Sequence, residues 1–254
     1  MARARMTRSA VLVVGLVAML ALPVAAGAAP QKNAARGKCT ITGTPRNDVL
    51  HGTARADVIC GLAGNDKIAG RGGNDIIVGG RGKDFMNGGI GNDTIKGGRG
   101  DDTLIGDEGN DILRGGDNKD HVMGNHGDDR LLGENGFDVV VGGLDDDVLF
   151  GGTKGDSLRG SKGDDIINGG IGRDRIIGGD GSDTIRGAAG SDTLNGRLGN
   201  DTIIGGTEPD RLNGGLGDDS LDGVDGQPGD KVRGQDGTDT CTADPGDLVT
   251  GCEL

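Results

Sequence analysis

The sequence predicts an all-β protein in which short strands stack into a solenoid of about ten 18-residue coils. Three observations support this fold class. A nine-residue unit recurs twenty times between Gly43 and Asp222 without an insertion or deletion, three of its positions never change in type, and an 18-residue period is superimposed on the nine-residue one. Strict short repeats are typical of folds in which each unit stacks on its neighbours.

The repeat has three constant positions. One regular copy, from Gly88 to Lys96, reads GGIGNDTIK, and we number its residues as positions 1 to 9. In all twenty copies position 1 is Gly, position 6 is Asp and position 8 is apolar. Gly also occupies position 4 in fourteen copies and position 2 in ten. Composition alone does not produce such columns over 180 residues.

Each unit predicts one turn and one strand. Positions 1 to 6 are rich in Gly, Asn and Asp and favour a tight turn. Positions 7 to 9, such as Thr94-Ile95-Lys96, predict a three-residue strand whose middle side chain points inward. Two units then form one coil, and the apolar residues at position 8 form a thin core. Stacked strands lie about 4.8 Å apart, so ten coils would extend roughly 45–50 Å.

The 18-residue period appears at position 5. In the even-numbered copies this position is Asn, Asp or Ser everywhere except at Ala56, whereas the odd-numbered copies include Lys83, Phe137 and Arg173. With two units in each coil, even-numbered turns stack along one edge of the solenoid and odd-numbered turns along the other. We call these the even edge and the odd edge.

The composition excludes an ordinary globular core. The 254 residues include 56 Gly, three Phe and neither Trp nor Tyr. A chain of this composition without a period would be classed as disordered. The strict repeat favours an ordered solenoid, because every unit contributes one apolar residue that its neighbours can bury.

The N-terminal segment predicts export from the cell. Residues 1–28 have the pattern of a signal peptide, with Arg3, Arg5 and Arg8 before an apolar stretch, and Ala26-Gly27-Ala28 as a cleavage site. Cleavage one residue later fits equally well. The apolar stretch is short for a bilayer span, and no later segment is apolar enough for one. We therefore expect a secreted, extracellular protein without a membrane span.

The remaining chain divides into three parts. Residues 29–38 predict a flexible lead-in, residues 39–242 the repeat array with its ends, and residues 243–254 a C-terminal cap segment. An eleven-residue unit, Gly223 to Arg233, interrupts the nine-residue period near the end of the array. Atypical terminal units are expected in a solenoid, because its last coils must cover exposed strand edges.

The charge of the chain argues for a cationic ligand. The formal net charge is −13, and it becomes −16 when the signal peptide with its three Arg is removed. Such a surface is unsuited to nucleic acid, which is bound by Lys and Arg. The acidic residues could serve solubility alone, but solubility does not require them to fall in one column.

The repeat resembles a known family. Its units match the Gly-Gly-x-Gly-x-Asp-x-apolar-x nonapeptide of RTX calcium-binding proteins over about 180 residues. The resemblance implies a parallel β-roll, a right-handed solenoid, with several Ca²⁺ ions held between stacked turns by the position-6 Asp and by turn carbonyls. Ca²⁺ takes six to eight hard oxygen ligands, and stacked carboxylates without a cation would repel one another.

The resemblance implies the position-6 carboxylates as calcium ligands. On the even edge these are Asp57, Asp75, Asp93, Asp111, Asp129, Asp147, Asp165, Asp183, Asp201 and Asp219. On the odd edge they are Asp66, Asp84, Asp102, Asp120, Asp138, Asp156, Asp174 and Asp192, and Asp48 and Asp210 complete the column. A single Asp of this kind could simply bond its own turn. We expect tighter sites on the even edge, because Lys83, Lys119, Lys154 and Arg173 lie in odd-edge turns.

The four cysteines predict two disulfides. They suit an oxidising exterior, and the plausible pairs are Cys39 with Cys60 and Cys241 with Cys252, one at each end of the array. The other pairings would join opposite ends of an extended rod. A zinc site is the alternative, although close Cys-x-x-Cys spacing is absent from the sequence.

Two further groups of residues bear on function. His51, His121 and His126 are scattered and are expected at the surface. Several apolar residues at outward positions could form a binding patch or be ordinary surface residues, namely Leu132, Val139, Val141, Val148 and Phe150.

These observations favour a secreted, non-enzymatic calcium-binding protein that folds on binding Ca²⁺. No nucleophile and base recur at a repeat-consistent spacing, and the repeats fill nearly the whole mature chain, whereas RTX exoproteins commonly carry a catalytic or pore-forming domain. The alternative is a calcium-dependent adhesion or structural module of the cell surface or matrix. Its protein or cell-surface partner would bind through the apolar residues.

Overall fold

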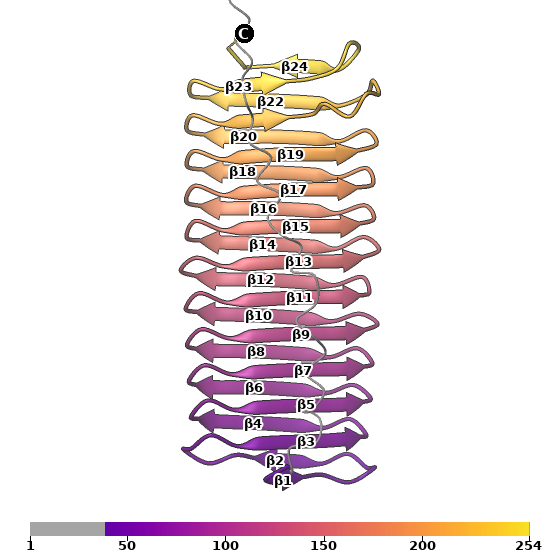
Figure 1. Ribbon diagram of the computed structural model, residues 1–254, viewed down its shortest axis with the longest axis vertical. Helices are drawn as coiled ribbons and strands as arrows, with labels where there is room; N and C mark the ends of the chain where they lie inside the picture. Colours follow the sequence, from indigo (N-terminus) through magenta and orange to yellow (C-terminus); the bar gives the residue numbers. More distant parts are fainter. Residues whose placement is uncertain (1–38, 254) are drawn as a thin grey trace, which may run out of the picture. The chain divides into compact units, whose positions relative to one another are not determined.

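The computed structural model describes residues 39–253, which form a solenoid of two parallel β-sheets and contain no helix (Figure 1). The predictions for residues 1–28 and 29–38 lie outside the described residues. Within residues 39–253, nothing forms a helix that could cross a bilayer. The all-β solenoid predicted from the repeats is confirmed.

Each sheet contains twelve strands in sequence order. Sheet A consists of β1 (Ile41–Thr42), β3 (Val58–Ala63), β5 (Ile76–Arg81), β7 (Thr94–Arg99), β9 (Ile112–Asp117), β11 (Arg130–Asn135), β13 (Val148–Thr153), β15 (Ile166–Ile171), β17 (Thr184–Ala189), β19 (Thr202–Thr207), β21 (Ser220–Asp222) and β23 (Thr240–Thr242). Sheet B consists of β2 (Val49–His51), β4 (Lys67–Gly72), β6 (Phe85–Ile90), β8 (Thr103–Glu108), β10 (His121–His126), β12 (Val139–Leu144), β14 (Ser157–Lys162), β16 (Arg175–Asp180), β18 (Thr193–Leu198), β20 (Arg211–Leu216), β22 (Lys231–Asp236) and β24 (Leu248–Thr250).

One coil contains two repeat units, as the 18-residue period predicts. The chain passes from a strand of sheet A through a turn to a strand of sheet B and back, so that Ile77, Ile95 and Leu113 are register partners in sheet A. The units after Asp222 also join the stack, which brings the solenoid to about twelve turns. The eleven-residue unit is accommodated in the loop before β22, where the register step becomes 20 residues between Arg211 and Lys231.

The strands are longer than the three residues expected from the sequence. β7, for example, covers positions 7 to 9 of one unit and positions 1 to 3 of the next. Gly98 and Arg99 continue the parallel ladder by pairing with Gly116 and Asp117, whereas Gly97 at position 1 is skipped. The turn therefore contains only positions 4 to 6. The prediction of a six-residue turn was wrong, because glycine at positions 1 and 2 does not stop the backbone from pairing with the next coil.

The core is a single column of aliphatic side chains. The position-8 residues are at most 2 % exposed from Ile59 to Val232, and only the terminal ones, such as Leu50 and Cys241, are partly buried. Burying such a side chain contributes about 1.5–3 kcal/mol. Because each strand supplies one such residue, the fold gains stability coil by coil rather than from a central core. The predicted thin apolar core is confirmed.

From Leu62 onward, most turns have the same backbone conformation with or without glycine. Gly89 at position 2 and Gly91 at position 4 have positive φ angles of 107° and 132°. From Leu62 onward, non-glycine residues at these positions adopt the same left-handed conformation, as in Arg197 with φ 91° and Lys154 with φ 78°. This conformation costs roughly 1–2 kcal/mol for an L-residue. The stacking of coils, rather than the local residue, therefore sets the turn geometry.

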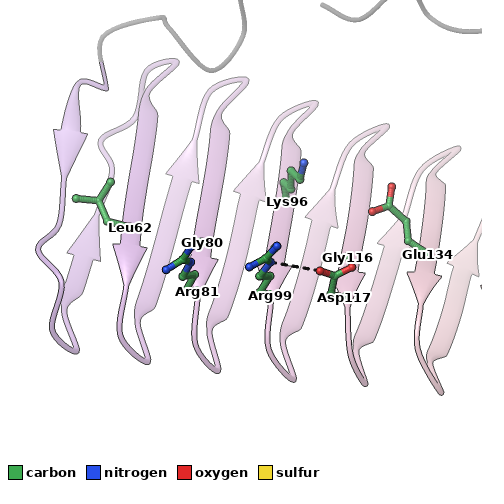
Figure 2. Close-up of a pocket in the computed structure, with 9 residues that line it drawn as sticks. Leu62, Gly80, Arg81, Lys96, Arg99, Gly116, Asp117 and Glu134 are labelled. Atoms are coloured by element: carbon green, nitrogen blue, oxygen red, sulfur yellow. Dashed lines mark ion pairs between the residues drawn. The ribbon is translucent and has the colours of Figure 1, made fainter.

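The outer face of sheet A contains a groove whose floor is formed by stacked position-2 glycines (Figure 2). Gly80, Gly98 and Gly116 form this floor, and Leu62 and Glu134 occupy the same position in the strands at its two ends. Arg81, Lys96, Arg99 and Asp117 lie along its sides.

The outward apolar residues do not form one patch. Leu132, Val148 and Phe150 lie on β11 and β13 of sheet A, whereas Val139 and Val141 lie on β12 of sheet B. The two sheets present opposite outer faces, so the alternative of ordinary surface residues is favoured over a single binding patch. The three histidines are exposed, as expected for surface residues.

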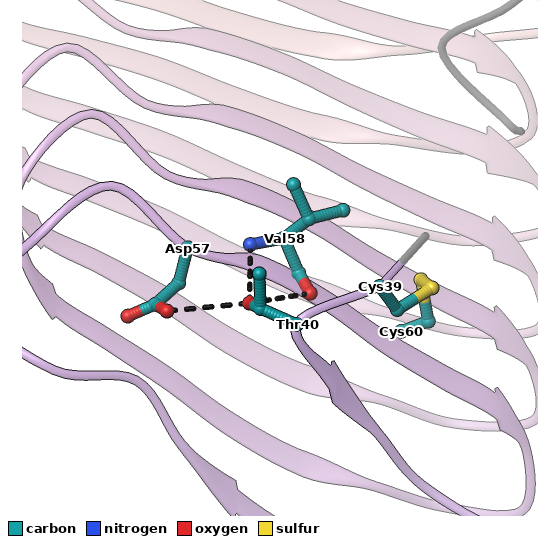
Figure 3. Close-up of a disulfide and its surroundings, with 5 residues drawn as sticks. All are labelled: Cys39, Thr40, Asp57, Val58 and Cys60. Carbon is teal, nitrogen blue, oxygen red and sulfur yellow. Dashed lines mark hydrogen bonds between the residues drawn. A yellow bond between two sulfur atoms is a disulfide. The ribbon is translucent and has the colours of Figure 1, made fainter. Parts of the chain in front are cut away.

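Disulfides close both ends of the solenoid. Cys39 pairs with Cys60 and Cys241 with Cys252, and no described cysteine is free. The predicted pairing is confirmed, and no thiolate is left for a zinc site. At the N-terminal end, Thr40 pairs with the next coil beside the disulfide, since its N–H donates to Val58 O (2.8 Å) and its hydroxyl accepts from Val58 N–H (2.9 Å; Figure 3).

Candidate metal centre

The position-6 aspartates line the inside of the solenoid. Side chains alternate along a strand, so an Asp two residues before an inward position-8 residue also faces inward. From Asp66 to Asp219 these side chains are at most 3 % exposed. Ionised carboxylates are rarely buried without a partner, because leaving water is costly. Eighteen such side chains in two columns therefore require a compensating interaction.

One carboxylate oxygen of each Asp joins a ladder between coils. The backbone N–H of Asp75 donates to Asp93 Oδ1, and the N–H of Asp93 donates to Asp111 Oδ1, both at 2.7 Å. The same bond recurs along both edges, from Asp48 to Asp239, at 2.6–3.0 Å. The ladder explains why position 6 must carry a short side chain with an acceptor oxygen.

The second carboxylate oxygen has no hydrogen-bond partner. The Oδ2 atom is buried and unpaired in seventeen of the eighteen predicted ligands, that is in all of them except Asp57. Within the described chain the same holds for Asp225 and Asp239, which were not among the predicted ligands. Asp239 repeats the position-6 pattern after the eleven-residue unit, so the sequence already contained the signal for it. Each unpaired buried acceptor costs about 1–3 kcal/mol, and more when it is charged.

The unpaired oxygens lie against the position-1 glycines. A Cβ atom added to Gly88 would be 2.2 Å from Asp93 Oδ2 and 2.9 Å from the carbonyl oxygen of Gly106. Position 1 is therefore Gly because the carboxylate and a carbonyl of the next coil occupy the space of a side chain. Sequence reasoning assigned this glycine to a turn and missed its role. Its occurrence in all twenty copies, against ten for position 2, was the available signal.

Burial disfavours the charged form of these carboxylates. Desolvation raises the pKa of Asp93 to about 6. It raises the pKa of Asp147 to about 8, with repulsion from Asp129 and Asp165 adding to the effect. Asp120 behaves similarly, with a pKa of about 8 caused by burial and by the charges of Asp102 and Asp138. Near neutral pH, the carboxyls with the highest pKa values therefore keep their protons unless a cation stabilises the charged form.

Asp57 differs because protein groups satisfy it. Its Oδ2 accepts bonds from the backbone N–H (2.7 Å) and the hydroxyl (2.8 Å) of Thr53, and its Oδ1 accepts from the Thr40 hydroxyl (3.2 Å; Figure 3). The bonds from Thr53 lower the pKa of Asp57. Thr44 satisfies Asp48 in the same way. In the first coil, threonine hydroxyls thus donate to the Oδ2 atoms of the position-6 aspartates, whereas in the later coils most of these Oδ2 atoms are unpaired.

The two edges differ outside the carboxylate columns. On the even edge, most position-5 side chains accept a backbone N–H from the next coil, as Asp146 does from Asp164 at 2.8 Å, whereas on the odd edge only three within residues 39–253 do so. On the odd edge, Lys154 places its ammonium group 5.3 Å from the centre of the Phe137 ring. The charge of Lys154 also lowers the pKa of Asp138, opposing the larger effect of burial. A cation from the protein itself therefore already acts on this part of the odd edge.

The donor set fits a hard divalent cation. It consists of unpaired carboxylate oxygens and backbone carbonyls, and Ca²⁺ takes six to eight oxygens of this kind. No three His, Cys, Asp or Glu side chains in residues 39–253 converge into a metal site, so carbonyls of the turns would have to complete the coordination. A bound Ca²⁺ would supply the positive charge that the buried carboxylates lack.

Comparison with known proteins agrees with the chemistry of the site. The family model of the RTX calcium-binding nonapeptide repeat matches eleven overlapping segments, which together cover residues 42–227. A search of curated proteins finds no significant match. The matched segments contain all the predicted calcium ligands and span more than half of the chain, and the chain therefore belongs to the family of RTX calcium-binding nonapeptide repeat proteins.

Proposed function

We propose that this protein is a secreted, non-enzymatic calcium-binding protein that folds when Ca²⁺ binds between its stacked turns. The observation that carries the proposal is the row of buried, unpaired Oδ2 atoms next to the position-1 glycines. The predicted ligands from Asp66 to Asp219 all belong to this row. Asp57 contributes least among them, because threonine already satisfies its carboxylate.

Coupling of folding to calcium follows from the energetics of these columns. In the absence of a cation, the folded chain must bury many carboxylates whose pKa values are raised, and it must order the many glycines of the repeats. Ca²⁺ binds the folded arrangement and has no comparable site in an extended chain. Its binding free energy therefore becomes folding free energy.

The proposal that the protein is secreted is supported by other observations than the calcium site. Both disulfides suit an oxidising compartment, and family membership gives calcium-binding repeats, which suit a compartment rich in Ca²⁺. The adhesion alternative depended on one continuous apolar patch. The distribution of that patch over two opposite faces takes away its support.

The direct test compares the mature protein with and without calcium. With Ca²⁺, we expect a β-type circular dichroism spectrum and several bound ions per chain by calorimetry and elemental analysis. With a chelator at neutral pH, we expect the spectrum of a disordered chain, and Mg²⁺ should restore little structure because it prefers six ligands in a rigid octahedron. A β spectrum that survives complete removal of calcium would refute calcium-driven folding.

A second test compares the two edges. Replacing Asp129 and Asp147 on the even edge by Asn should lower calcium affinity more than replacing Asp120 and Asp138 on the odd edge. The reason is that Lys154 already neutralises part of the odd edge. Titration calorimetry on the two double variants measures the difference. Equal losses would show that the lysine has no influence on calcium binding.

A further inference from the structure

The groove on the outer face of sheet A has the dimensions of a ligand site. It is an open depression of about 600 Å³, and this volume is within the range of small-molecule sites. Its floor runs across Gly80, Gly98 and Gly116, and it is bounded by Leu62 in β3 and Glu134 in β11 (Figure 2). Four strand spacings separate those ends, or roughly 19 Å. The groove is thus a short, open depression rather than a track along the whole solenoid.

The floor exists because three successive strands have glycine at an outward position. Without side chains, the backbones of these strands can be approached directly. On sheet B, position 2 never carries glycine in two successive strands, since residues such as Asp107, Asn125 and Ser161 intervene. A flat floor of this kind is therefore a property of sheet A.

Three cationic side chains surround the floor. Arg81 and Arg99 are register partners on neighbouring strands, and they follow the floor glycines in the chain. Lys96 precedes the floor on β7, so that it lies on the opposite side. All three side chains are exposed to solvent. A ligand on the floor would have cationic groups on both sides.

The acidic residues of the groove already have partners. Asp117 is 3.5 Å from the Arg99 guanidinium, and Glu134 forms an ion pair with Arg114. These are the two ion pairs of the described residues, so Arg81 and Lys96 are left without an acidic partner there. Two uncompensated cations beside one groove are notable in a chain with a net charge of −13.

The repeat itself does not require these cations. Further along sheet A, Gly152 and Gly170 form another stretch of floor. The residues that flank it are Phe150, Asn168, Thr153 and Ile171, none of which is charged. The fold therefore forms a glycine floor with or without cations. Their placement around Gly80, Gly98 and Gly116 points to a ligand.

We propose that this groove binds a compact, flat dianion. One of its oxyanion groups would bind Arg81, with Arg99 next to it, and the other would bind Lys96 across the floor, while its ring would lie on the glycine backbone. Carboxylate and sulfate groups share the required chemistry, because both accept two hydrogen bonds from an arginine. A nucleic acid is disfavoured, because the net charge of −13 would repel a long polyanion.

The experiment uses the calcium-saturated mature protein and two rigid probes that bind Ca²⁺ weakly. Benzene-1,3-disulfonate represents sulfates and benzene-1,3-dicarboxylate represents carboxylates, with benzene-1,3-disulfonamide as the neutral control. We expect saturable binding of at least one dianion in a calorimetric or NMR titration, weakened by added salt because the cations are exposed. The probe that binds more tightly shows whether the groove prefers a sulfate-type or a carboxylate group.

Variants decide whether the groove is the binding site. Arg81→Ala with Lys96→Ala should weaken binding by at least about tenfold, which corresponds to about 1.4 kcal/mol. Arg186→Ala is the matched control, since it removes an exposed cation from the same sheet outside the groove, and it should leave binding unchanged. Unchanged circular dichroism in calcium confirms that the variants fold.

Failure of this proposal can be distinguished from failure of the proposed calcium function. The absence of saturable binding by both dianions, or an equal loss in the Arg186→Ala variant, would overturn the groove proposal. Neither result would alter calcium binding, which is measured separately on the same samples.

Discussion

At the scale of single residues, the glycines of the repeat have different physical roles. Gly at positions 2 and 4 supplies a left-handed backbone, and other residues replace it there with the same φ sign. Gly at position 1 supplies space, because a carboxylate oxygen and a carbonyl occupy the place of a side chain. The cost of losing space at position 1 cannot be relieved by bending one turn. This explains why position 1 is the glycine column without exceptions.

This difference predicts unequal effects of glycine-to-alanine changes. Gly88→Ala would place a Cβ 2.2 Å from Asp93 Oδ2, so we expect a loss of stability of several kcal/mol, comparable to overpacking of a core, together with weaker calcium binding. Gly72→Ala is the matched control, because its Cβ would meet nothing closer than 3.8 Å. That variant should be neutral or more stable by about 0.4–1 kcal/mol.

Urea unfolding in calcium measures both variants. If Gly88→Ala and Gly72→Ala unfolded at the same urea concentration, the space at position 1 would not be the reason for its glycine column.

The sequence predicted more at this scale than local rules usually allow. The Asp column, the apolar column and the disulfide pairs were read from strict periodicity, which also places residues in space. Periodicity did not predict which of the two carboxylate oxygens of each Asp has a hydrogen-bond partner. Asp93 has a partnered Oδ1 and an unpaired Oδ2 only because the preceding coil is stacked against it and Asp75 N–H donates to Oδ1. The threonine bonds to Asp57 depend on the chain end in the same way.

At the scale of strands and turns, periodicity gave the pairing but not the strand length. The 18-residue register was predicted because only two-unit coils explain the contrast at position 5. The six-residue strands were not, because glycine has low β-propensity and positions 1 to 3 therefore resemble turn residues. Tertiary pairing with the next coil overrides that preference, as the partners of Gly98 show. The outward apolar residues are separated for a related reason, since neighbours in sequence lie on opposite sheets.

The Asp columns predict how the ion-free solenoid responds to pH. The pKa of Asp147 is raised to about 8 and that of Asp93 to about 6, chiefly by burial, whereas an Asp in the unfolded chain has a pKa of about 3.9. Between these values the folded chain binds more protons than the unfolded chain. Its stability without calcium should therefore be greatest below about pH 4 and should fall as the pH rises from 4 to 8.

Urea unfolding of calcium-free protein at several pH values measures this slope. Asp147→Asn should reduce it, because the amide keeps an acceptor oxygen and carries no charge. Asp180→Asn, at an exposed position at the end of β16, should leave it unchanged. Stability that is constant or rises with pH in the absence of calcium would contradict the assignment of burial as the cause. In saturating calcium the trend should reverse, since binding requires ionised carboxylates.

At the scale of the whole solenoid, stability depends on neighbours and ends. Each coil contacts only the coils next to it, so the free energy of folding is close to a sum of unit and interface contributions. The end coils have one neighbour fewer, and their position-8 residue Leu50 is only partly buried. The two disulfides are located in these end coils, which have the fewest stabilising contacts. The N-terminal one closes a 21-residue separation and the C-terminal one an 11-residue separation.

Removing one disulfide should therefore loosen one end and leave the middle intact. Replacing Cys39 and Cys60 by Ser removes a constraint worth about 3 kcal/mol for a loop of this length. In calcium, we expect hydrogen exchange to accelerate in β2 and β4, while β12 and β14 keep their protection. The matched variant without Cys241 and Cys252 should accelerate exchange only in β22 and β24. Uniform acceleration along the chain would show that the solenoid unfolds as one cooperative unit, in which the ends stabilise every coil.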